Sequence, residues 1–130
     1  MYEKTTQLMT VTVEPEYLDD QSEPADQHYV WAYHVTIRNQ GEHAVQLLNR
    51  YWRIIDSTGR IQEVRGSGVV GEQPILNPGE VFEYTSGTPL STPSGFMAGS
   101  YEMTTLDGDH FDIAIPDFSL DSPYVDRSIN

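Results

Sequence analysis

The stretch YVWAYHVTI, residues 29–37, alternates large apolar side chains with smaller or polar ones. Its odd positions are Tyr29, Trp31, Tyr33, Val35 and Ile37. Because successive side chains of a β-strand point to opposite faces, this period of two predicts a strand with one buried face. Half-buried strands of this kind are the units from which two-layer β domains are built.

Similar short runs recur on both sides of this stretch. Residues 9–17 and 110–118 alternate in the same way, and the turn Asp107-Gly108 predicts a hairpin between the last run and the strand before it. Residues 45–56 mix both parities, which indicates a strand with a bulge near Asn49. No segment keeps a clean helical period between its glycines and prolines. We therefore expect an all-β domain of about seven main antiparallel strands in two sheets.

The length and composition fit a single domain. A chain of 130 residues is long enough to bury one core. We place the domain at residues 1–122 and expect a flexible tail over residues 123–130, where the sequence becomes polar. The chain has no cysteine, and no apolar run approaches the roughly 20 residues that cross a bilayer. These features predict a cytoplasmic protein without a membrane partner.

The charge is strongly acidic and unevenly distributed. Twenty acidic residues against seven basic ones give a net charge of −13, which would repel a phosphate backbone, so we expect no nucleic-acid partner. The basic residues nevertheless gather in one segment. That segment contains Arg50, Arg53, Arg60 and Arg65. It is locally positive and leads directly into a glycine-rich loop.

This glycine loop, residues 65–80, reads RGSGVVGEQPILNPGE and contains the spacing G-x-G-x-x-G. The same spacing binds the pyrophosphate of dinucleotides when a helix begins directly after it. Here Pro74 and Pro78 leave no room for a helix of more than a turn. The dinucleotide interpretation therefore fails on its own structural requirement.

Two interpretations of the glycine loop remain open. In the first, its glycines provide the positive φ angles that a loop between two strands needs. In the second, its backbone N–H groups form an anion-binding nest, with Arg65 and either Arg60 or Arg53 adding positive charge. The residues of this candidate anion or pyrophosphate site are Arg60, Arg65, Gly66, Ser67, Gly68 and Gly71.

The remaining candidates for chemistry are histidines and acidic clusters. His28 and His34 share a strand face but lie about 20 Å apart by strand rise, too far to hold one metal ion. The acidic residues 19–26 and 107–112 do not match a calcium-binding loop. Residues 86–95 carry hydroxyl groups without a nucleophile motif, which predicts an exposed loop and an alternative interaction surface. We therefore expect no catalytic residue, no metal and no cofactor.

Several segments together closely resemble the bacterial ApaG family. The resemblance covers about residues 5–122 and includes YVWAYHVTIRNQG at 29–41, the whole block 49–103 and HFDIAIPDFSL at 110–120. It implies an immunoglobulin-like, fibronectin type III-like β-sandwich. This agrees with the strand pattern reached above from the residues.

The resemblance also carries functional implications. The same domain occurs in a eukaryotic F-box protein and in a DNA polymerase delta-interacting protein, where it acts as a protein-interaction module. Bacterial members are associated with cobalt resistance and magnesium efflux, which we expect to be indirect here because the sequence has no dense set of metal ligands. The glycine spacing is a feature of the family for which pyrophosphate binding has been suggested.

These observations predict a non-enzymatic binding or adaptor module. Its expected contact surface is the basic glycine loop, and its expected partners are an unidentified protein and a phosphate-containing small molecule. The alternative is a nucleotide or pyrophosphate hydrolase that uses a divalent cation. That alternative requires carboxylates to converge beside Gly68.

Overall fold

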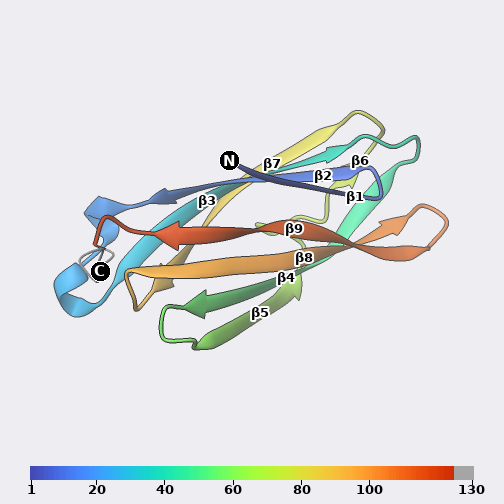
Figure 1. The fold of residues 1–130 in the computed structure, drawn as a ribbon. Coiled ribbons are helices and arrows are strands. Elements are labelled where there is room, and N and C mark those ends of the chain that lie inside the picture. The colour runs from blue at the N-terminus through green and yellow to red at the C-terminus, as the bar shows by residue number, and fades with distance from the viewer. Residues whose placement is uncertain (125–130) are drawn as a thin grey trace.

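The computed structural model describes residues 1–124 as two layers of β-strands (Figure 1). The strands are β1 (Tyr2–Thr6), β2 (Met9–Tyr17), β3 (Tyr29–Asn39), β4 (Val45–Asp56), β5 (Ile61–Ser67), β6 (Ile75–Leu76), β7 (Val81–Leu90), β8 (Ser94–Thr105) and β9 (His110–Asp121). Two short 3-10 turns, η1 (Asp19–Gln21) and η2 (Pro24–Asp26), lie between β2 and β3. Within residues 1–124, no helix has the length and apolar character that crossing a membrane requires.

The strands form two antiparallel sheets. One has the order β1-β2-β3-β7, and the other has the order β5-β4-β8-β9, with the short strand β6 also paired to β4. The sheets pack face to face around one hydrophobic core. The predicted immunoglobulin-like, fibronectin type III-like sandwich is confirmed.

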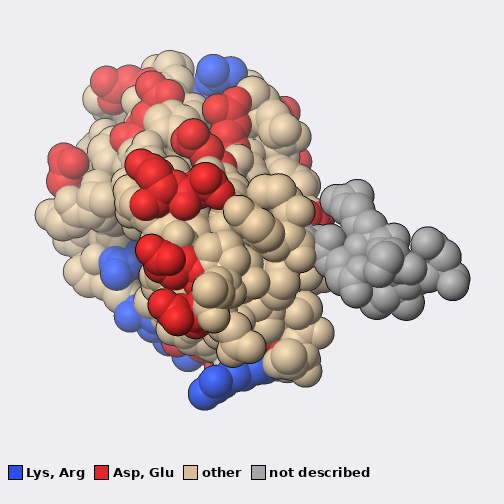
Figure 2. All heavy atoms as spheres, turned by 90° about the vertical axis from the view of Figure 1, so that its left-hand side faces the viewer, with Lys and Arg blue, Asp and Glu red and all other residues tan. Residues whose placement is uncertain are grey.

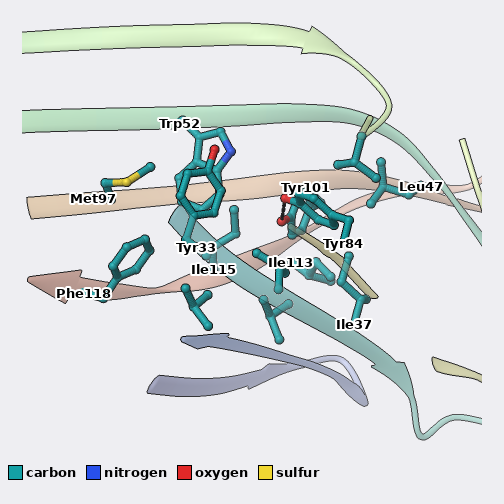
Figure 3. Packing of buried hydrophobic residues seen from close by; sticks show 14 of the residues in the cluster. Tyr33, Ile37, Leu47, Trp52, Tyr84, Met97, Tyr101, Ile113, Ile115 and Phe118 are labelled. Carbon is teal, nitrogen blue, oxygen red and sulfur yellow. Dashed lines mark hydrogen bonds between the residues drawn. The ribbon is translucent and has the colours of Figure 1, made fainter. Parts of the chain in front are cut away.

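The alternating stretch of β3 supplies the centre of that core. All five of its odd-numbered side chains are buried. Tyr33 packs against Trp52 of the opposite sheet, with ring centroids 5.1 Å apart, and Trp52 meets the ring of Phe118 from β9 edge to face at 6.0 Å (Figure 3). Each such ring contributes on the order of 2–3 kcal/mol through burial.

Seven of the nine strands were expected from the sequence, and two were not. The middle of β1 is exposed, and β6 has only two residues, so neither carries an apolar alternation. The expected bulge is confirmed, because the pairing of β4 with β8 shifts register between Leu47 and Asn49.

The expected exposed loop over residues 86–95 was wrong. β7 continues to Leu90, and β8 begins at Ser94. Thr88 and Leu90 are buried on the inward face of β7, whereas Pro89 lies between them at a position that an edge strand tolerates.

Part of the expected tail makes contacts with the domain. The ring of Tyr124 lies 6.3 Å from that of Tyr17 and 6.4 Å from that of Tyr29, and its hydroxyl donates to Asp19 Oδ1 at 3.4 Å. Residues 125–130, the rest of the expected tail, lie outside the described residues. The domain boundary at residue 122 remains a prediction.

Candidate functional site

The glycine loop connects β5 to β6 through a tight turn. Val69 and Glu72 exchange two backbone hydrogen bonds, of 2.8 and 2.9 Å, around the central residues Val70 and Gly71. Both central residues have positive φ angles, 44° and 81°, which is the pattern of a type I′ turn. No helix follows within the described residues, and β6 begins at Ile75.

Each glycine of the motif has a structural reason. Gly68 has a φ of 63°, and an added Cβ would lie 2.2 Å from the carbonyl oxygen of Glu72. Gly71 occupies the positive-φ position of the turn. Gly66 lies in β5 and needs no unusual φ, but an added Cβ there would lie 2.8 Å from the guanidinium of Arg50. The interpretation in which glycines shape the loop holds for Gly68 and Gly71.

Val70 has an unfavourable backbone conformation. A β-branched residue rarely adopts a positive φ, and such strain costs about 1–3 kcal/mol. We expect Val70→Asn to raise the free energy of unfolding by about 1 kcal/mol, because asparagine before glycine suits a type I′ turn. Urea denaturation measures this change. Val69→Asn is the contrasting variant and should destabilise, because Val69 is buried.

The backbone N–H groups of the loop are largely engaged. Gly68 donates to the carbonyl of Leu48 at 2.7 Å, and the amides of Val69 and Glu72 bond each other's carbonyls. A nest needs N–H groups that are free to converge on an anion. An anion at this loop would therefore have to use the N–H groups at the tip of the turn, those of Val70 and Gly71, or the neighbouring arginine side chains.

Arg50 is the arginine that organises the loop. Its Nη1 donates to the carbonyl oxygens of Ser67 at 3.1 Å and of Gly68 at 3.0 Å. The side chain passes over Gly66, where the missing Cβ leaves room for it. Arg50 was not among the predicted site residues, although its position in the alternating pattern of β4 could have indicated that it faces inward. After the bulge, Arg50 shares its parity with the buried residues Trp52 and Ile54.

A cavity of about 200 Å³ opens beside Arg50, between the two sheets. It is lined by Tyr33, Arg50, Trp52, Val69, Val70, Gly71, Tyr84 and Ser86. Burial raises the pKa of Tyr33, and the nearby Arg50 charge partly offsets the rise. Within residues 1–124, no carboxylate forms a salt bridge with Arg50. The cavity therefore presents a half-buried positive charge together with hydroxyl groups.

The outer face of the same sheet carries a second group of charges. Arg65 lies over the ring of Tyr51, with Cζ 4.7 Å from the ring centroid, and its Nη2 is 3.4 Å from Glu63 Oε2. The Tyr51 hydroxyl donates to the same oxygen at 2.6 Å. This bond is the main reason why the pKa of Glu63 is lowered and that of Tyr51 is raised. An adjoining hollow of about 500 Å³ is lined by Asn49, Arg50, Tyr51, Arg65, Gly66, Ser100, Glu102 and Asp112.

Arg60 lies apart from the other predicted site residues. It belongs to the turn between β4 and β5, where its amide donates to Asp56 Oδ1 at 3.0 Å. A hydrogen bond from the Thr58 hydroxyl is the main reason why the pKa of Asp56 is lowered. Arg60 and Arg65 are separated by about 17 Å along β5. The structure thus brings Arg65, Gly66, Ser67, Gly68 and Gly71 together and places Arg60 at the opposite end of the strand.

The charges are unevenly distributed on the face of the molecule that Figure 2 shows. Figure 2 shows acidic side chains across the upper and middle parts of one end of the molecule, while most basic side chains in view gather on the lower side, where β4 and β5 lie. The locally positive segment expected from the sequence therefore lies on one side of the molecule, along β4 and β5.

The other candidates for chemistry lie on the surface. His34 contacts Glu83 at 3.0 Å, and His110 contacts Glu102 at 3.0 Å. Hydrogen bonds from His110 and Asn49 lower the pKa of Glu102. Among the described residues, no three histidine, aspartate or glutamate side chains are grouped so that they could hold a metal ion.

The comparison with known proteins assigns the family. The model of the ApaG domain matches residues 19–105. The chain belongs to the ApaG domain family. Among its relatives, Protein ApaG of Paramagnetospirillum magneticum is 62% identical over 130 residues, and that of Parvibaculum lavamentivorans is 59% identical over 130 residues; each alignment covers 100% of both chains.

A solved structure of an ApaA protein from Bordetella pertussis has the same fold. It superposes on this ApaG-family chain with a TM-score of 0.86 and 51% sequence identity, covering 89% of this chain and 94% of that one. The names of these relatives state no reaction, ligand or partner. The family resemblance noted from the sequence is confirmed.

Proposed function

We propose that this ApaG-family chain is a non-enzymatic binding module that holds an acidic group of a protein partner on the β4–β5 side of the sandwich. The observation that carries the proposal is the half-buried guanidinium of Arg50. It is held in place by two carbonyls of the glycine loop and, within residues 1–124, has no carboxylate partner. A guanidinium in this state favours an external anion.

The surrounding charges support an acidic ligand. Two acidic side chains near the arginines are already engaged, because Glu63 accepts hydrogen bonds from Tyr51 and Arg65 and Asp56 accepts them within its own turn. Arg53 pairs in register with Glu63 and is exposed. This local field would attract an acidic segment, whereas the net charge of −13 would repel acidic surfaces elsewhere.

The rigidity of the site supports binding over chemistry. Loop carbonyls position Arg50, and Tyr51 together with Glu63 positions Arg65, so both guanidinium groups are oriented before a partner arrives. Preorganised side chains lower the entropy cost of association. Glu102 and Glu63, two carboxylates beside the site, already accept hydrogen bonds and are therefore poorly placed to bind a metal ion. We propose that the family's association with cobalt resistance and magnesium efflux is indirect and depends on the protein partner.

The proposal is tested by adding a hexaglutamate peptide and, separately, inorganic pyrophosphate to ¹⁵N-labelled protein. We expect the peptide to shift the amide signals of Ser67 and Gly68, which lie beside the Arg50 guanidinium, and those of Arg65 and Gly66. Arg65→Ala should weaken binding about fivefold, since an exposed charge pair contributes up to about 1 kcal/mol. Arg60→Ala is the matched control, and affinity should stay within about twofold.

Two outcomes would contradict this function. Equal losses in Arg65→Ala and Arg60→Ala would mean that only overall charge attracts the peptide. Shifts confined to residues 66–71 with pyrophosphate, at concentrations where the peptide has no effect, would assign the site to a phosphate-containing small molecule instead.

A further inference from the structure

β5 is an edge strand with unused backbone hydrogen-bonding groups. At the two ends of its pairing with β4, Gly68 N donates to Leu48 O and Asp56 N donates to Arg60 O. Hydrogen-bonded and non-bonded pairs alternate in an antiparallel ladder, so the even-numbered residues of β5 bond to β4. Ile61, Glu63 and Arg65 consequently direct their N–H and C=O groups away from β4. No backbone group within residues 1–124 bonds to them.

β5 lacks two of the features that usually protect a sheet edge, a proline and a bulge, although it carries the charged residues Glu63 and Arg65. The edge strands β7 and β9 each contain a proline, Pro89 and Pro116, and proline interrupts the row of N–H donors. β5 contains no proline, and its ladder with β4 runs over seven residue pairs without a register shift. A free, regular edge of this kind is a template for another strand.

The side chains on the outer face of β5 define what such a strand would carry. Ile61 pairs in register with Ile55, which in turn pairs with Phe96. Ile61 is 50% exposed and Phe96 is 57% exposed, so this row offers apolar contact. Four residues further along β5, Arg65 offers positive charge on the same face. An added strand would therefore place an apolar side chain beside Ile61 and a carboxylate beside Arg65.

We propose that β5 receives an extended acidic segment of the partner as an additional strand, with an apolar residue and an acidic residue four positions apart. This inference rests on the proposed function and names the form in which the acidic group arrives. Backbone hydrogen bonds to Ile61, Glu63 and Arg65 supply affinity, and the two outer-face contacts supply selectivity.

Charge also decides between this occupant and a second copy of the chain. Two copies joined through β5 would bring together two molecules of net charge −13. A short acidic segment brings fewer negative charges than a second copy would, and it places one of them beside Arg65. The electrostatics therefore favour a peptide over self-association.

The test uses a threonine-rich peptide with a valine and an aspartate four residues apart, and a second peptide of equal composition with these residues adjacent. We expect the first to bind at least about fivefold more tightly and to protect the amides of Ile61, Glu63 and Arg65 from hydrogen exchange. Glu63→Pro removes one outward N–H without breaking the ladder to β4, and should weaken binding about fivefold relative to Glu63→Ala. Circular dichroism checks that both variants fold.

The other possible results separate strand addition from simple charge binding and from self-association. If both peptides bind equally, depend on Arg65 and leave the edge amides unprotected, strand addition is wrong and the proposed function stands. If neither peptide nor hexaglutamate binds, both proposals are wrong. If sedimentation shows a dimer that protects the same amides without peptide, the edge belongs to a second copy, and the peptide proposal is overturned.

Discussion

Replacing Gly68 with alanine is expected to lower the free energy of unfolding by about 3 kcal/mol. Two costs add at this position. The φ of 63° is unfavourable for alanine by about 1 kcal/mol. The new Cβ would also lie 2.2 Å from the carbonyl oxygen of Glu72, which forces the backbone to shift at a cost of about 1–3 kcal/mol. Urea denaturation followed by circular dichroism measures the loss.

Gly71→Ala is the matched control for this substitution. Gly71 has a similarly positive φ of 81°, but nothing lies within 4 Å of an added Cβ. Its loss should therefore be about 1 kcal/mol, the conformational cost alone. Equal losses at Gly68 and Gly71 would show that steric contact with Glu72 contributes nothing and that only φ matters.

The strands that face the core could be predicted from the sequence. In β3, each odd-numbered residue is buried and large, so the period of two is complete over the whole stretch. The middle of β1 is exposed, and this strand is held mainly by backbone pairing to β2. Backbone pairing leaves no trace in side-chain polarity, which is why β1 was not recognised.

The candidate site could be predicted only in part, because its key residue lies at a change of register. Arg50 directly follows the bulge in β4, and the bulge moves it onto the inward-facing parity. Sequence alternation predicts that a charged side chain at position 50 is exposed, unless the bulge is assigned to the correct residue of β4. Arg60 was included in the predicted site because it is only five residues from Arg65 in the sequence. Along an extended strand these five residues span about 17 Å, so the two side chains lie far apart.

The glycine spacing has a physical meaning different from its usual one. Of the three glycines in the motif, Gly68 and Gly71 have positive φ angles, whereas Gly66 makes room for a side chain from the neighbouring strand. In this protein the glycine spacing allows the side chain of Arg50 to pack against the turn at residues 69–72. The sequence contains all three glycines, but it does not reveal that Arg50 pairs in register with Gly66.

Three buried tyrosines should make the protein unusually sensitive to alkaline pH. The hydroxyls of Tyr84 and Tyr101 bond each other between the sheets (Figure 3). Burial raises the pKa values of Tyr33, Tyr84 and Tyr101, whereas unfolded tyrosine titrates near 10. The folded state therefore holds these protons more tightly than the unfolded state. The stability is fully present below about pH 10 and is lost as the pH rises through the range above it.

The expected slope is at most about 1.4 kcal/mol per pH unit for each buried tyrosine, or roughly 4 kcal/mol per unit while all three stay protonated in the folded state. Denaturant titrations between about pH 8 and pH 12 measure it. Lys4 is the chain's single lysine, so lysine titration contributes little. The double variant Tyr84→Phe/Tyr101→Phe should lose most of the slope, because it removes the two hydroxyls whose pKa values burial raises most. Tyr101→Phe alone leaves the Tyr84 hydroxyl without its partner and should cost about 1–3 kcal/mol at neutral pH. An unchanged alkaline slope in the double variant would show that these hydroxyls do not control the transition.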